Sequence, residues 1–242
     1  MWIYLLIIAL IPGVAIMIFI YRKDRHEREP LKKIFICFLL GILAAVISAP
    51  IEWVIMEYGK NWLGAGTTLD KVFEGLVAAA LVEELLKFLM VRTYAYPKSS
   101  FNEPLDGIVY AVMVAMGFAT IENVGYVMLD PQNGITTGIL RMFLAVPGHG
   151  CWGVIVGYFI GKAKFAEKNR GIFMIIGLLI AILMHGTYDS LLFLKDAPNF
   201  SDGKYGLALI GGAVATAILG YVLALKAIKL HQQLTRQYLP EI

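Results

Sequence analysis

The sequence predicts an all-α fold, a polytopic membrane helix bundle of about seven transmembrane helices, and three observations support this. The 242-residue chain is 59% hydrophobic, whereas an ordinary soluble domain is about 45–50% apolar. Only 16% of its residues are charged. Its lysines and arginines stand in short groups between apolar runs, and these runs reach the roughly 20 residues that a helix needs to cross the hydrocarbon core.

Seven apolar segments meet this length, and each is expected to form one transmembrane helix. In chain order they are Trp2–Tyr21, Ile34–Met56, Val72–Val91, Gly107–Leu129, Ile139–Gly161, Ile172–Leu194 and Tyr205–Leu225. The first is expected to be a retained anchor, since no basic residue precedes its apolar core and it lacks a small-residue cleavage pattern. All connections are short, so we expect a single integral membrane domain over residues 1–242.

The loop charges predict the orientation of these helices. The loops 22–33, 92–106 and 162–171, together with the tail after Leu225, carry fifteen lysines and arginines. The alternate loops 57–71, 130–138 and 195–204 carry four. Because positively charged loops stay in the cytoplasm, we expect the N-terminus outside and the C-terminus in the cytoplasm.

Composition also excludes some classes of function. The net charge of +3 is small, and no basic stripe with interleaved aromatic residues is present, so no nucleic-acid partner is expected. The two cysteines, Cys37 and Cys151, lie inside apolar segments and are expected to be small packing residues.

Several ionisable residues stand inside the predicted helices, where they are expensive and usually functional. They are Glu83, Glu84 and Lys87 in the third segment, Glu122 in the fourth, Arg141 and His149 in the fifth, and His185 and Asp189 in the sixth. Counted from the predicted outer ends, Glu84 lies 12 residues deep, His149 10, His185 9 and Glu122 7. At 1.5 Å per residue these depths differ by only about 8 Å. The four segments therefore predict one shared polar layer, while Arg141, nearer the outer end, is expected to extend towards the surface.

Local spacing suggests how these residues interact. His185 and Asp189 are one helical turn apart, so the carboxylate can accept the second imidazole N–H. Glu83 and Lys87 share this spacing, which allows an internal ion pair, and Tyr126 is placed to hydrogen-bond Glu122.

The sequence around His149 predicts an interruption of the fifth helix. Pro147, Gly148 and Gly150 flank it, and such residues break or kink a helix. Non-helical backbone at this depth is tolerated only inside protein or beside a water-filled cavity, so we expect a cavity next to His149.

These residue types allow peptide hydrolysis in two ways. In the first, His149, His185 and a carboxylate, for which Glu122 is the candidate, hold Zn²⁺ while a second glutamate acts as the base. In the second there is no metal, and Glu83 or Glu84 activates water with a histidine while His185 and Asp189 stabilise the oxyanion. The sequence alone does not separate the two schemes.

The motifs that carry these residues resemble the PrsW family of bacterial membrane proteases, within the wider group of CaaX-protease and bacteriocin-processing enzymes. They are EELLK (Glu83, Glu84, Lys87), FATIEN (Phe118, Glu122, Asn123), His149 and HGTYD (His185, Asp189), spread over about residues 72–194. The CaaX enzymes have a histidine after Phe-x-x-x where this chain has Glu122, and His149 is an additional histidine. This chain therefore departs from the CaaX pattern at the position of their water-activating histidine.

The resemblance implies an intramembrane endopeptidase of the bacterial cell membrane, classed as a metalloprotease, whose paired glutamates are the catalytic base. It implies an extracytoplasmic first cut in a single-span substrate within the lipid bilayer, such as an anti-sigma factor, at the start of a stress response. The candidate catalytic residues are Glu83, Glu84, Glu122, His149, His185 and Asp189, with Lys87, Asn123 and Tyr126 in supporting roles.

Two other functions fit the same polar layer. A proton- or ion-coupled transporter could use it as a relay, although no paired broken helices stand in corresponding halves of the sequence. A non-enzymatic scaffold or immunity protein could retain the fold, and its cellular function would survive substitution of Glu84.

Overall fold

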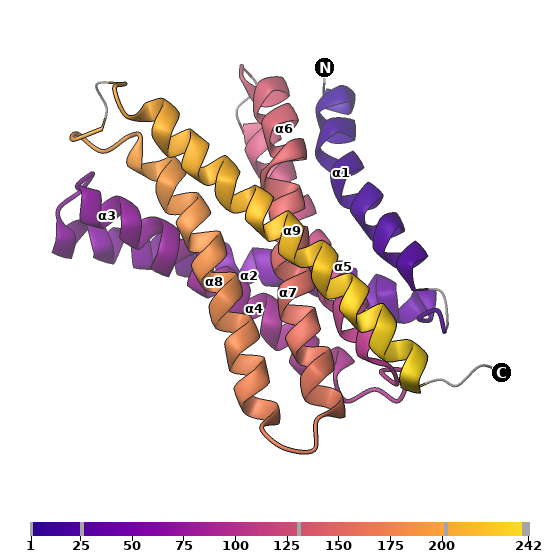
Figure 1. Ribbon diagram of the computed structural model, residues 1–242. Helices are drawn as coiled ribbons and strands as arrows, with labels where there is room; N and C mark the ends of the chain where they lie inside the picture. Colours follow the sequence, from indigo (N-terminus) through magenta and orange to yellow (C-terminus); the bar gives the residue numbers. More distant parts are fainter. Residues whose placement is uncertain (1, 25–26, 130–131, 201–202, 239–242) are drawn as a thin grey trace.

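The computed structural model describes the chain except residues 1, 25–26, 130–131, 201–202 and 239–242. Among the described residues the regular elements are all helical, which confirms the predicted fold class. The helices are α1 (Trp2–Lys23), α2 (Leu31–Leu63), α3 (Thr68–Phe73), η1 (Glu74–Leu81), α4 (Val82–Met90), η2 (Val91–Ala95), α5 (Pro104–Leu129), α6 (Gly134–Phe143), α7 (Ala145–Phe165), α8 (Arg170–Leu194) and α9 (Gly206–Tyr238). We call the end of the bundle where α1 begins the upper end, and the end where α7 meets α8 the lower end (Figure 1).

Six stretches of the described chain are long and apolar enough to cross a membrane, taking α6 and α7 together as one. The predicted span Val72–Val91 lies within a seventh helical stretch, 68–95, which consists of α3, η1, α4 and η2 in succession. This stretch differs from the six apolar stretches because it contains more charged residues, Glu83 and Lys87 among them. The chain is therefore a multi-pass helical membrane bundle.

Helix α5 forms the centre of the bundle (Figure 1) and packs against α1, α2, α7 and α9. Each residue from Pro104 to Thr120 is buried. The most apolar window of α5 has a mean hydropathy of 1.6, against 2.9 for α1 and 2.7 for α2. A helix that is surrounded by protein can be less apolar than one that faces lipid, so α5 can carry polar residues.

The crossing of α2 and α5 depends on two glycines. A Cβ atom on Gly41 would overlap the carbonyl oxygen of Val114, and one on Gly117 would overlap that of Phe38. Small residues at membrane helix crossings let the two backbones approach closely. This contact fixes α5 against α2 within two turns of Glu122.

The helix interruption near His149 lies one turn earlier than predicted. The chain leaves the helix at Leu144, between α6 and α7, and Pro147 and His149 both lie in the opening turns of α7. Proline is tolerated in a first helical turn because the N–H that it lacks has no intrahelical partner there. The prediction of broken backbone at His149 itself is therefore wrong, and the break separates α6 from α7 instead.

Candidate active site

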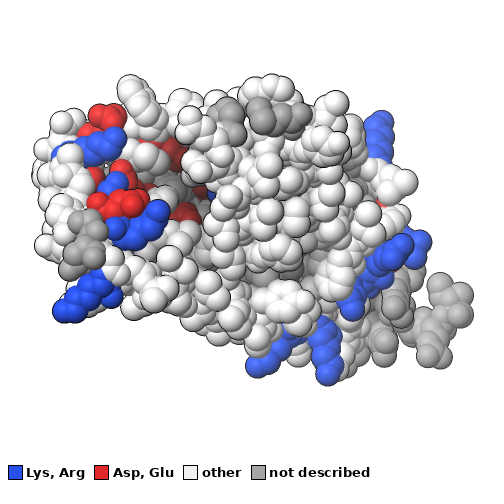
Figure 2. All heavy atoms as spheres, turned by 90° about the horizontal axis from the view of Figure 1, so that it is seen from above, with Lys and Arg blue, Asp and Glu red and all other residues white. Residues whose placement is uncertain are grey.

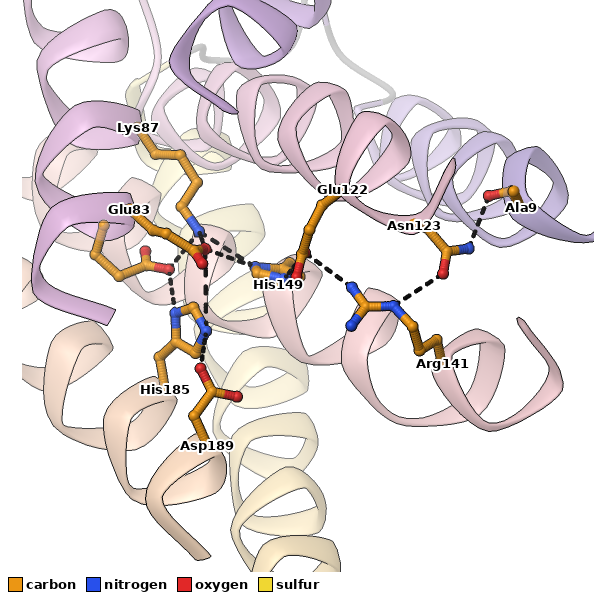
Figure 3. Close-up of polar contacts among 10 residues, drawn as sticks. Ala9, Glu83, Lys87, Glu122, Asn123, Arg141, His149, His185 and Asp189 are labelled. Carbon is orange, nitrogen blue, oxygen red and sulfur yellow. Dashed lines mark hydrogen bonds and ion pairs between the residues drawn. The ribbon is translucent and has the colours of Figure 1, made fainter. Parts of the chain in front are cut away.

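Side chains from α4, α5, α6, α7 and α8 meet in one network (Figure 3). We call this network the polar cluster. It consists of Glu83, Glu84, Lys87, Glu122, Arg141, His149, His185 and Asp189. The structure thus brings together all six residues that the sequence singled out as catalytic.

Close helix packing places the paired glutamates beside α8. A Cβ on Gly186 would lie 2.9 Å from the Cα atom of Leu76, and one on Gly75 would lie 2.5 Å from the backbone nitrogen of Ser190. The segment η1, which carries Leu76, is π-helical and leads directly into Glu83 and Glu84. Short π-helical segments are often found at functional sites.

Lys87 links the two glutamates to His149. Its Nζ donates to Glu84 Oε1 at 2.6 Å and to Glu83 Oε2 at 3.3 Å. It also lies 3.2 Å from His149 Nδ1, which must accept this bond because an ammonium group has no lone pair. The internal ion pair suggested by the Glu83–Lys87 spacing is present, and both adjacent glutamates take part in it.

The opposite nitrogen of His149 faces α5. Its Nε2 lies 2.8 Å from Glu122 Oε2 and donates to it, since Nδ1 serves as the acceptor. Glu122 therefore fixes both the tautomer and the ring orientation of His149.

His185 lies between two carboxylates. Its Nδ1 is 3.0 Å from Glu84 Oε1, and its Nε2 is 3.0 Å from Asp189 Oδ2. The predicted one-turn contact between His185 and Asp189 is confirmed. In both histidines Nε2 contacts an outer carboxylate, whereas Nδ1 contacts Lys87 in His149 and Glu84 in His185. Nε2 of His185 also lies 4.0 Å from Glu83 Oε2.

Arg141 does not extend towards the surface as predicted. Its side chain is 14% exposed, and Nη2 lies 2.9 Å from Glu122 Oε2. Its Nε donates to Asn123 Oδ1 at 2.9 Å, and Asn123 donates in turn to the Ala9 carbonyl at 3.0 Å. Asn123, a predicted supporting residue, thus joins Arg141 to α1 (Figure 3).

Tyr126 takes a different place from the one predicted. No hydrogen bond joins it to Glu122 among the described residues; its ring instead packs against the Arg141 guanidinium, whose Cζ lies 4.1 Å from the ring centroid. Half of the residue is exposed. Its contact with the polar cluster is therefore indirect, through Arg141.

Aromatic rings cover the two histidines. The Trp152 ring stacks on His185 with 4.0 Å between centroids and 16° between planes, and it meets the edge of His149 at 5.0 Å. Phe118 lies against His149 and under the Lys87 ammonium. Trp152 was not among the predicted site residues, although its position three residues after His149, on the same helical face, could have indicated it.

Glu52 was also missed as a neighbour of this region. Its Oε1 is buried without a hydrogen-bond partner in the described chain, and its charge is close enough to interact with Glu122, Lys87 and His185. A further ionised carboxylate beside the polar cluster would add to its excess of negative charge.

Water can reach the polar cluster from the upper end. The Glu122 side chain is 22% exposed and that of Asp189 16%, whereas Glu84 is 2% exposed. Figure 2, which looks onto the upper end, shows acidic side chains inside a hollow of this face. Below Glu84 and Lys87 the structure has a cavity of only about 10 Å³, barely enough for a single water molecule.

Four side chains of the polar cluster fit a metal ion. One ligand atom each from Glu83, Glu84, His149 and His185 lie within 4.8 Å of one another, and imidazole with carboxylate is a common zinc donor set. The Lys87 ammonium already contacts three of the four, so the site attracts a cation. Glu122, a predicted ligand, is not in this group and binds the outer nitrogen of His149 instead.

The formal charges also favour a divalent cation. The polar cluster has four carboxylates and two permanently charged cations, Lys87 and Arg141, which leaves a charge of −2 when both histidines are neutral, the form in which imidazole binds a metal. A divalent ion would balance this charge.

Comparison with known proteins gives a consistent result. A family profile described as PrsW family intramembrane metalloprotease matches residues 29–219. Protease PrsW of Geobacillus kaustophilus is 37% identical over 82% of this chain and 84% of its own length. The proteins of the same name from Clostridioides difficile and Bacillus subtilis are 36% and 34% identical, over 79% and 75% of this chain and 80% and 79% of their own lengths. No solved structure matches the chain significantly.

Proposed function

Since the chain belongs to the PrsW family of intramembrane metalloproteases and is a multi-pass bacterial membrane protease, we propose that its polar cluster is the site of peptide hydrolysis. The proposed catalytic core is about residues 72–194. One observation carries the proposal: Nε2 of each histidine is held by an outer carboxylate, while Nδ1 of His185 contacts Glu84 and Nδ1 of His149 contacts Lys87, which binds both glutamates. Such outer carboxylates orient and strengthen histidine ligands at metal sites.

We propose Zn²⁺ as the metal, held by Nδ1 of His149, Nδ1 of His185 and the Glu84 carboxylate. When bound, a zinc ion polarises the carbonyl group and makes its water ligand more acidic. Lys87 would have to turn away from His149 while keeping its contact with a glutamate, and its long side chain allows this.

Glu83 is the proposed general base. Its hydrogen bond to Lys87, at 3.3 Å, is longer than that of Glu84, and its Oε2 lies 4.0 Å from ring nitrogens of both histidines. Its carboxylate is thus less engaged than that of Glu84 and can accept a proton from water, then deliver it to the leaving amide nitrogen. Arg141 positions Glu122, which positions His149, so both act through His149.

The metal is tested on purified full-length protein with a single-span membrane substrate. We expect about one zinc per active protein by elemental analysis, loss of that zinc in His149→Ala, and recovery of chelated enzyme on adding zinc. Full activity after exhaustive chelation would instead support the glutamate mechanism without metal.

We propose that the substrate is cut on its extracytoplasmic side, as in the first cleavage of a membrane-anchored anti-sigma factor. The partial exposure of Glu122 and Asp189 and the acidic hollow on the upper face in Figure 2 support this side, as does the predicted orientation with the N-terminus outside. The substrate would unwind locally so that its scissile carbonyl is accessible.

Two measurements test this side of cleavage. Reporter fusions after Arg28 and after Asn133 should be cytoplasmic and external, respectively. Mass spectrometry of the fragments should place the cut within a few residues of the outer boundary of the substrate span; a cut on the cytoplasmic side would contradict the proposal.

A further inference from the structure

A second group of carboxylates lies at the lower end of α5, far from the polar cluster. Asp24 directly follows α1, Glu103 directly precedes α5, and Asp106 is the third residue of α5. All three are completely buried, and one oxygen atom of each lies within 4.8 Å of the others. We call these three residues the acid cluster. Asp106 and Glu122 are 16 residues apart on α5, which corresponds to about 24 Å along the helix.

Backbone hydrogen bonds hold two of the three carboxylates in place. Asp24 Oδ2 accepts from the Glu29 N–H at 3.1 Å, and Asp106 Oδ2 accepts from the N–H groups of Asn102 and Glu103 at 2.8 Å each. The second oxygen of each aspartate, Oδ1, is therefore held in a fixed direction.

The remaining oxygens of the acid cluster face only one another and Glu29. Within the part of the chain that the structure describes, Asp24 Oδ1, Asp106 Oδ1 and both oxygens of Glu103 are buried without a hydrogen-bond donor. Glu103 lies within hydrogen-bond reach of Asp24, and Asp106 of Glu29, but two carboxyl groups form such a bond only when one of them carries a proton. No described lysine or arginine forms an ion pair with any of the three. Leaving buried polar atoms unsatisfied is costly, and more so for charged groups, so something must compensate these four oxygens.

The neighbouring residues strengthen the negative charge of the site. Glu29 is also buried and accepts a short hydrogen bond from the Tyr110 hydroxyl, which Ser100 contacts at 2.6 Å. Glu29 thus has its own partner, while its charge adds to the field at the acid cluster.

The geometry points to a binding site for a hard divalent cation, and we propose that the acid cluster binds Mg²⁺ or Ca²⁺. Both ions prefer oxygen ligands, and two oxygens on opposite sides of Ca²⁺ are about 4.8 Å apart. The site has no nitrogen or sulfur ligand, which distinguishes it from the proposed zinc site. A bound ion would fasten the α1–α2 connection to the start of α5 and so join the ends of three helices.

Protons are the alternative way to compensate the acid cluster. Burial is the main cause that raises the pKa of the Asp24 carboxyl, and it raises the pKa of the Glu103 carboxyl to about 8. A protonated cluster stabilises the fold most at low pH. This stabilisation falls as the pH rises from about 4.5, the ordinary pKa of a glutamate, to about 8, the pKa of buried Glu103. The cation and the proton therefore predict different behaviour.

The test measures the melting temperature of purified full-length protein, first depleted of metal and then given one equivalent of zinc. At pH 7.5, either Mg²⁺ or Ca²⁺ should raise Tm by about 5 °C at a hundred times its Kd. Glu103→Gln should abolish this shift while retaining the zinc content of the wild type. Without added cation, Glu103→Gln should melt at or above the wild-type temperature, since the carboxylate it removes has no hydrogen-bond donor.

Glu27→Gln is the matched control. Glu27 lies in the same connection but is exposed and hydrogen-bonded to Asn102 at 2.9 Å, so this variant should keep the full shift.

Asp106→Asn is a second test, because the amide oxygen can still accept the two backbone N–H groups while the negative charge is lost. The proposal is overturned if neither cation shifts the wild-type Tm at concentrations up to about 10 mM, which is above the Kd of the weakest calcium sites in proteins. It is equally overturned if Glu103→Gln keeps the shift, or if Tm falls with rising pH identically with and without cation.

Discussion

The two ends of α5 hold two buried groups of carboxylates, and the negative charge of each group is compensated in a different way. In the polar cluster, Glu84 and Glu122 each contact both a histidine and a basic side chain. In the acid cluster, Glu103 contacts no basic side chain of the described chain, and both of its oxygens lack a hydrogen-bond donor. The chain supplies part of the counter-charge at one end and leaves all of it to an outside ion at the other.

The difference shows that burial of acidic groups alone does not identify an active site. Acid–base catalysis needs several groups with different proton affinities in contact with one another. Of the two clusters, only the polar cluster combines carboxylate, imidazole, ammonium and guanidinium groups. A group of carboxylates alone offers a place for a cation but no proton donor and acceptor pair. The following predictions test how far the polar cluster depends on its internal partners.

The largest effect is expected where the partners are the proposed reacting groups. His149→Ala, His185→Ala and Glu84→Ala should each lower cleavage by at least about 1,000-fold, because catalytic groups that act as a unit are lost together. The measurement is the initial rate of substrate cleavage in proteoliposomes, with Glu167→Gln, an exposed loop variant, as the control. Activity within tenfold of the wild type would remove that residue from the site.

A second effect is expected from separating Arg141 from Glu122. Arg141→Met should lower activity by about 10- to 100-fold, the usual loss when a residue behind a metal ligand is removed. It should also destabilise the protein by up to about 3 kcal/mol, the lower end for breaking a buried pair, because Glu122 keeps some solvent contact.

The double variant Arg141→Met with Glu122→Gln sharpens this test. Removing both charges should restore much of the melting temperature without restoring activity. If Arg141→Met alone left Tm and activity unchanged, the polar cluster would not depend on internal compensation.

A smaller effect is expected from the stacked ring. Trp152→Phe keeps an aromatic group beside His185 but reduces the overlap, and aromatic contacts contribute about 0.5–1.5 kcal/mol. Activity should therefore fall by no more than about tenfold, while zinc content is retained. A loss as large as that of His185→Ala would mean that Trp152 does more than support the histidine.

The smallest effect is expected at Tyr126. Tyr126→Phe removes a hydroxyl that has no hydrogen bond to Glu122 and retains the ring that packs on Arg141. Cleavage rate and Tm should match the wild type. A marked loss of rate would show that the hydroxyl contacts the substrate or Glu122 during the reaction.

The polar cluster could be predicted because ionisable residues in apolar segments are rare and expensive. Glu83, Glu84, Glu122, His149 and His185 were therefore visible in the sequence, and depth counting placed them together. The contact between His185 and Asp189 followed from helical periodicity alone.

Other features depend on tertiary structure and gave no such signal. Arg141 was assigned to the surface because its partner Glu122 lies on another helix, and the pairing follows from how α6 packs on α5. Asp24 and Glu103 lie in connections, where charges are ordinary, so only the structure reveals that they are buried. The predicted position of the helix break was wrong because Pro147 fits two structures equally well. A proline can kink a continuous helix, or it can stand in the first turn of a new helix, as it does after Leu144.

The uneven hydropathy of the helices has a consequence for biosynthesis. Helices α1 and α2 are apolar enough to enter the bilayer by themselves, whereas the stretch 68–95 carries Lys87, and one lysine at a helix centre opposes insertion by about 3 kcal/mol. This stretch is stabilised only when α5, α7 and α8 bring its polar partners, and α8 follows the other two in the chain. The proposed active site therefore cannot assemble until α8 has been synthesised, so a nascent chain that lacks α8 stays inert.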